Sequence, residues 1–160
     1  MKKVIFLLIT LILFVACGSE SYEKEQFLGE WKYTLQDTLT DDGKYKVGFT
    51  SIRTYNSNNT YSTLGAIQIA TVDEKKRLLV GIRSSGEWDI DGDELTINNK
   101  KFKFQSITDI DSDKDMKELM EELKSYSEDT KDIDKISYVD ESKIIVVVDD
   151  ESSMVWRKVK

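Results

Sequence analysis

Residues 86–97 have the sequence GEWDIDGDELTI, and this stretch decides the fold class. Trp88 and Ile90 alternate with acidic residues, an Asp-Gly-Asp turn signal follows, and Leu95 and Ile97 then resume the alternation. A period of two on both sides of a glycine-containing turn is typical of two antiparallel strands with one buried face. The stretch therefore predicts a β-hairpin.

Similar short segments with turn signals between them fill most of residues 27–106, and two further strands are expected at 143–149 and 154–159. One helix interrupts the strands, because apolar residues recur at helical spacing from Asp113 to about Tyr126. Short strands at close spacing favour an antiparallel meander, and hence a barrel or a sandwich. The chain is therefore expected to be mainly β, with one amphipathic α-helix.

Two apolar runs, at Leu78–Ile82 and Ile144–Val148, show no alternation. A strand that is apolar on both faces needs cover on both faces. The helix carries a single apolar stripe, so we expect it to be packed outside the sheet, over one of these two strands.

The first residues have the features of an export signal. Lys2 and Lys3 precede an apolar run, Val4–Ala16, that is too short to cross a bilayer comfortably, since a span needs about 20 residues. The end of the run, with Cys17 as the only cysteine of the chain, resembles the lipobox of bacterial lipoproteins. This resemblance implies cleavage before Cys17 and its acylation with chains such as palmitate. An uncleaved membrane anchor and an ordinary secreted protein are the alternatives.

On this interpretation residues 1–16 are a signal peptide, 17–26 are the acylated cysteine and a polar tether, and 27–160 are one β-barrel domain. Removal of the signal takes away two lysines and no acidic residue, so the net charge changes from −7 to −9. An acidic surface repels nucleic acid, which excludes it as a partner. Membrane contact is expected through the lipid anchor. Since Gly18 follows the cysteine, a host that sorts lipoproteins as enteric bacteria do would place the protein in the outer membrane, facing the periplasm.

Few residues indicate chemistry. The chain has no histidine, which removes the usual general base and zinc ligand. Asp111, Asp113, Asp115 and Glu122 fit four positions of an EF-hand loop, but Met116 stands where that loop needs glycine. We therefore interpret them as the acidic start of a helix, which the helix dipole favours. No metal or cofactor is expected.

Two further patterns contain residue types that catalysis uses. Glu87, Asp89 and Asp91 share one face of a strand, opposite the apolar face, so solvated carboxylates are expected. Ser21 and Lys24 match a Ser-x-x-Lys pattern, but they lie in the expected tether, where nothing would hold them in place. No catalytic residue is predicted, and the protein is not expected to be an enzyme.

Gly29-Glu30-Trp31 and Gly86-Glu87-Trp88 repeat one Gly-x-Trp triplet. Together with the Gly-Asp-x-Leu that follows the second triplet, they resemble the motifs of small bacterial lipocalin-like lipoproteins. The resemblance implies a closed barrel in which Trp31 plugs one end and an arginine of the last strand covers it; Arg157 is the candidate. The alternative is that Trp31 and Trp88 are ordinary core residues of another β-meander.

For function, the lipocalin resemblance implies a module that binds a small apolar or amphipathic ligand. The alternative is an envelope interaction protein, such as an inhibitor or assembly factor, whose barrel is filled by its own side chains. The sequence does not name a protein partner. Large aromatic residues that are expected to line the interior are Tyr33, Tyr45, Phe49, Tyr61, Trp88, Phe102 and Phe104.

Overall fold

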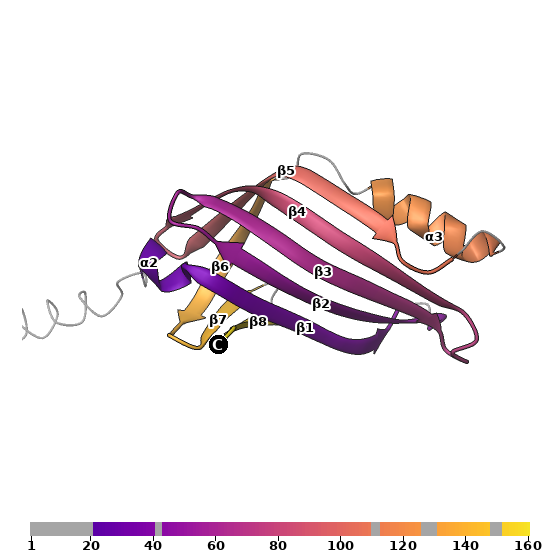
Figure 1. Cartoon of the computed structure of the whole chain (residues 1–160). Helices are drawn as coiled ribbons and strands as arrows, with labels where there is room; N and C mark the ends of the chain where they lie inside the picture. The colour runs from indigo at the N-terminus through magenta and orange to yellow at the C-terminus, as the bar shows by residue number, and fades with distance from the viewer. Residues whose placement is uncertain (1–20, 41–42, 110–112, 126–130, 148–151) are drawn as a thin grey trace, which may run out of the picture.

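The computed structural model describes residues 21–40, 43–109, 113–125, 131–147 and 152–160. In chain order the elements are α2 (Lys24–Phe27), β1 (Gly29–Leu39), β2 (Tyr45–Tyr55), β3 (Thr60–Thr71), β4 (Arg77–Asp91), β5 (Glu94–Ser106), α3 (Lys114–Ser125), β6 (Lys131–Val139), β7 (Lys143–Val147) and β8 (Ser153–Lys158). Each strand pairs antiparallel with the next, and β8 returns to β1 (Figure 1). The prediction of an antiparallel meander that forms a barrel is confirmed.

The barrel closes fully only around the end that holds α2. β1 pairs with β8 only at Trp31–Lys158 and Lys32–Arg157. β5 pairs with β6 only from Glu94 to Asn98. Because β6, β7 and β8 are short, the long strands β1–β5 continue beyond this ring as a curved sheet (Figure 1).

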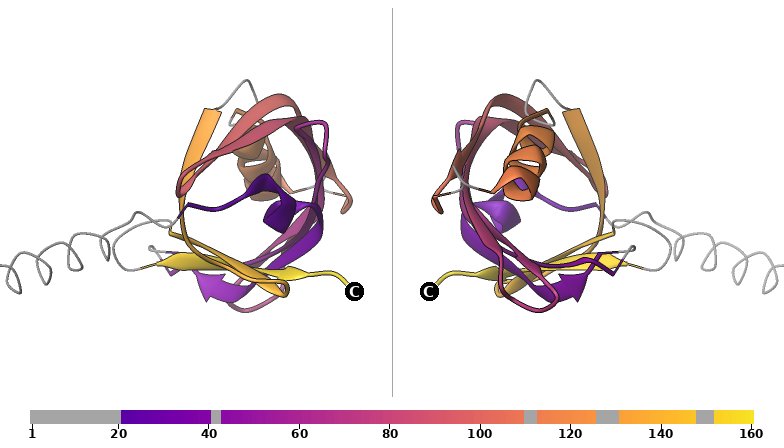
Figure 2. Two further views of the ribbon diagram at one scale, coloured as in Figure 1. Left: turned by 90° about the vertical axis from the view of Figure 1, so that its left-hand side faces the viewer. Right: turned by 90° about the vertical axis from the view of Figure 1, so that its right-hand side faces the viewer.

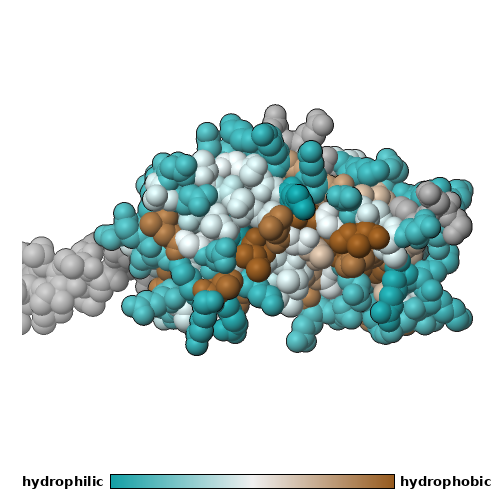
Figure 3. Space-filling model, viewed as in Figure 1, coloured by the Kyte–Doolittle hydropathy of each residue, from teal (hydrophilic) through white to brown (hydrophobic). Residues whose placement is uncertain are grey.

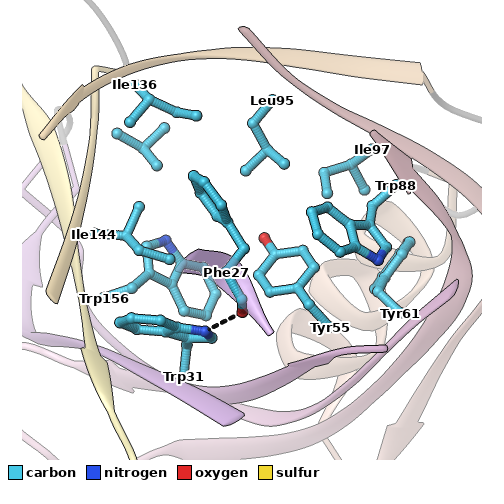
Figure 4. Packing of buried hydrophobic residues seen from close by; sticks show 11 residues of the cluster. Phe27, Trp31, Tyr55, Tyr61, Trp88, Leu95, Ile97, Ile136, Ile144 and Trp156 are labelled. Carbon is cyan, nitrogen blue, oxygen red and sulfur yellow. Dashed lines mark hydrogen bonds between the residues drawn. The ribbon is translucent and has the colours of Figure 1, made fainter. Parts of the chain in front are cut away.

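The inner face of the barrel carries two clusters of buried apolar side chains. The closed-end cluster consists of Phe27, Trp31, Tyr55, Tyr61, Trp88, Leu95, Ile97, Ile136, Ile144, Val146 and Trp156 (Figure 4). The second cluster, in the open half, consists of Ile69, Leu78, Val80, Met116 and Met120. The two clusters share no residue, so the long strands carry two separate cores.

Helix α3 lies in a different place from the one expected. Its buried Met116 and Met120 pack against Leu78 and Val80, whose side chains point inward on β4. Seen from the open end, the helix lies within the ring of strands (Figure 2). The helix therefore covers the inner face of the open half and is not packed outside the sheet. The physical reason is that the short strands leave this inner apolar face uncovered.

Asn98-Asn99 is a pair typical of turns and would predict one here, but β5 continues through it with a bulge opposite Gly86. A Cβ at Gly86 would lie 1.9 Å from the carbonyl oxygen of Asn98, so only glycine fits this crossing. Strand β6 was not predicted at all. Its inward positions include Asp132 and Asp134, so it shows no apolar alternation.

Candidate functional site

The N-terminal helix α2 plugs the closed end of the barrel. Phe27, at the end of this helix, is fully buried, and its ring lies 6.3 Å from that of Tyr55 and 6.1 Å from that of Trp88. The indole nitrogen of Trp31 donates a hydrogen bond of 2.5 Å to the carbonyl oxygen of Phe27 (Figure 4). The plug and the first strand are thus joined inside the core.

Residues just before the plug are also attached to the barrel. The Tyr22 amide donates to the Gly92 carbonyl at 3.0 Å, in the turn between β4 and β5. Lys24 forms an ion pair of 2.6 Å with Asp89 and donates to Asn59 at 3.3 Å. The expected tether therefore ends earlier than predicted, because the chain from Tyr22 onward belongs to the folded domain.

Trp31 closes the barrel end, but its cationic partner is Lys158. The register of β1 and β8 places Lys158 opposite Trp31 and Arg157 opposite Lys32. The Lys158 ammonium lies 4.3 Å from the Trp31 ring centre and donates to the Leu28 carbonyl, and burial lowers its pKa. Arg157 is exposed. The expected pairing was wrong by one residue, which in a strand turns the side chain to the other face.

The aromatic residues expected to line the interior do point inward, as their register positions show. Many of them pack on one another rather than around a hollow. Ring centres are 5.8 Å apart for Tyr33 and Phe49, and 4.8 Å apart for Phe102 and Phe104. Tyr61 and Trp88 are buried in the closed-end cluster, and Tyr45 packs against the second cluster.

A polar layer that the sequence analysis missed lies between the two clusters, around the inward-pointing Arg53. Its guanidinium donates to the hydroxyls of Thr63 at 3.1 Å and Tyr55 at 3.4 Å. The same group stacks on aromatic rings, 4.9 Å from the centre of Trp156 and 5.4 Å from that of Tyr61. Continuing the period-two pattern of β2 past Phe49 would have placed Arg53 on the inner face.

Carboxylates of β6 complete this layer. Tyr61 donates to Asn99, and Asn99 in turn donates to Asp132 at 3.2 Å. Burial raises the pKa of Asp134, the charge of Arg53 opposes this rise, and Asp132 adds to it. The layer holds opposite charges inside the barrel. The hydroxyl groups of this layer have no histidine beside them to act as a general base, because the chain contains no histidine.

Several of the acidic residues that fit a metal or catalytic pattern have other roles in the structure. Asp113 caps the start of α3 by accepting from the amides of Asp115 and Met116, and Lys76 pairs with both aspartates at 3.2 and 2.8 Å. Asp111 lies outside the described residues, as does Cys17. Glu87 lies 3.9 Å from Lys100.

The architecture defines a class of protein: a small antiparallel β-barrel with a self-packed interior and an N-terminal plug. Within the described residues, no helix is both long and apolar enough to cross a membrane. The comparisons then give the family. The family described as "Trans-membrane regulatory protein ToxS" matches residues 19–155, and the chain belongs to this ToxS family. No curated protein matches the chain. The barrel implied by the lipocalin resemblance is present, but the family shown is ToxS.

Proposed function

We propose that this protein is a non-catalytic, membrane-associated regulatory subunit that binds another envelope protein through an open strand edge of its barrel. The regulatory description of the ToxS family supports an interaction role. The interior supports it as well, because its aromatic side chains fill the closed end. The single observation that carries the proposal is the edge of β1.

Strand β1 pairs with β2 from Gly29 to Leu39 but with β8 only at Trp31 and Lys32. In the part of the chain that the structure describes, residues 33–39 have no strand partner on the side away from β2. Leu35 and Leu39 on this segment are 39% and 57% exposed. An unpaired strand edge with exposed apolar side chains is a template on which a partner can add a strand.

We expect the pair of variants Thr34→Pro and Leu35→Pro to distinguish the role of the free β1 edge in binding from its role in stability. Neighbouring residues of an antiparallel strand point their backbone N–H groups to opposite sides, so one variant removes a bond to β2 and the other removes a donor at the free edge. The variant that changes only the free edge is the one whose urea unfolding midpoint stays nearly unchanged, and we call it the edge variant. In cells of the host, a photo-crosslinking residue at Gln36 should capture a partner, and the edge variant should abolish this crosslink.

The control for this experiment is the same photo-crosslinking residue at Ser62, an exposed position within paired β3. The partner captured at Gln36 is then purified and mixed with the isolated protein. A crosslink of equal yield from Ser62, or a stable edge variant that still binds the partner, would contradict the proposal.

The anchor is a separate part of the proposal. We propose that Cys17 is acylated and holds the protein in the cell envelope; the tether then spans only the few residues between Cys17 and the docked Tyr22. The description "trans-membrane" favours the alternative of an uncleaved anchor. We expect Cys17→Ser to abolish labelling with a palmitate analogue and to release the folded domain from membranes. A Cys17→Ser protein that stays in the membrane fraction with residues 1–16 attached would show the uncleaved anchor.

A second function, the binding of a small amphipathic molecule, is favoured by one observation. The Ser51 hydroxyl is buried in the polar layer and has no hydrogen-bond partner among the described residues. Together with the Arg53 guanidinium it could receive a polar group inside the barrel. Mass spectrometry of an organic extract of the gently purified protein distinguishes this function from a purely side-chain-filled barrel.

A further inference from the structure

The outer face of the long strands carries a hollow that the interior and the β1 edge do not explain. It has a volume of about 930 Å³ and lies over β3, β4 and β5. Leu64 and Ile107, at its border, are 60% and 61% exposed. Gly81 lines the hollow, and there is space above it, since the nearest atoms to a Cβ built there would be those of Ile107, at 3.5 Å or more, and the Gln105 carbonyl at 3.7 Å. On this side of the molecule, Figure 3 shows hydrophobic residues next to residues of intermediate hydropathy.

The border of the hollow is basic. The register places Leu64 opposite Arg83, and Arg83 directly opposite Lys103, with all three exposed on the outer face. Like charges directly opposite one another destabilise a sheet. Neither cation has an ion pair with a carboxylate in the described parts of the chain. Lys124 of α3 also borders the hollow and binds Glu121 at 2.6 Å.

We propose that this hollow docks an acidic segment of a partner protein, in which Asp or Glu flank apolar side chains. The apolar side chains enter over Gly81, between Leu64 and Ile107, and the carboxylates pair with Arg83 and Lys103. Charge complementarity carries the choice of occupant, because an unpaired basic pair stands out on a chain with a net charge of −7.

A bilayer surface fits less well for two reasons. A flat surface reaches only the border of a concave site, and the rest of this acidic protein is repelled by anionic lipid. A protruding peptide segment, in contrast, fills a hollow of this size with its side chains. The proposal does not rest on the β1 edge, which lies on another strand.

The test uses the full chain in a neutral detergent and a fluorescein-labelled synthetic peptide of alternating Leu and Glu pairs. We expect saturable binding in fluorescence anisotropy, weakened by salt. Arg83→Glu with Lys103→Glu should weaken it by about tenfold or more. Gly81→Leu, which places a side chain in the hollow from a position where a Cβ makes only ordinary contacts, should weaken it similarly at an unchanged urea midpoint. The matched control is Lys32→Glu with Arg157→Glu, the like-charged pair on the outer faces of β1 and β8, with an expected change below about twofold.

Four outcomes would overturn the proposal. They are no saturable binding, equal binding of a peptide with Gln in place of Glu, an equal loss in the control pair, and binding to phosphatidylglycerol vesicles that depends on Arg83 and Lys103. The last of these would assign the hollow to a membrane surface. Because the assay contains no host protein, its result is independent of the β1 edge experiment.

Discussion

Trp31→Ala should lower the free energy of unfolding by about 3–5 kcal/mol, the usual loss when a large buried aromatic side chain is truncated. Trp31 is fully buried, and its indole nitrogen holds the carbonyl of Phe27. Truncation would therefore both leave a cavity and loosen the α2 plug. Trp31→Phe should cost less, because it keeps most of the apolar volume, although it still loses the hydrogen bond to Phe27. Urea unfolding followed by tryptophan fluorescence measures the loss.

A double-mutant cycle tests the closing pair directly. Trp31 and Lys158 should be coupled by about 0.5–2 kcal/mol, the range of a cation over an aromatic ring. Trp31 and Arg157 should be additive to within about 0.5 kcal/mol, since Arg157 faces outward from the neighbouring position. Arg157→Lys alone should change stability by about 0.5 kcal/mol or less. Coupling to position 157 rather than 158 would show that the register of β1 and β8 is one residue different.

Met120→Ala should cost about 2–5 kcal/mol, because Met120 is buried between α3 and the inner face of the open half. The same range is expected for Met116→Ala. Amide hydrogen exchange should become faster in β4, where Leu78 and Val80 form the other side of the contact. Both measurements together test whether the helix is an integral cover of the sheet.

The matched control on the helix is Glu118→Ala, whose side chain is exposed and forms an ion pair with Lys114 at 3.5 Å. It should change stability by about 0.5 kcal/mol or less. Equal effects at positions 118 and 120 would mean that α3 is an appendage and that the second cluster does not depend on it.

The identity of the elements followed from the sequence where apolar alternation is strong. Trp88, Ile90, Leu95 and Ile97 all lie on the buried face of their hairpin, as their alternation indicated. The helix was expected from Asp113 to about Tyr126 and is observed from Lys114 to Ser125. Strand β6 escaped prediction because its inner face carries aspartates, which pattern analysis assigns to solvent.

Local sequence determined which segments other than β6 are strands, which face of each of these strands is apolar, and that Trp31 belongs to the core. Only the tertiary structure decided which side chains from distant parts of the chain contact one another. Lys158 rather than Arg157 covers Trp31 because the register between strands far apart in the chain is set by their pairing. Helix α3 enters the open half because the lengths of the strands leave the inner face of that half uncovered. An apolar stripe on a helix or strand indicates that this face will be buried, but only the assembled sheet determines which residues bury it.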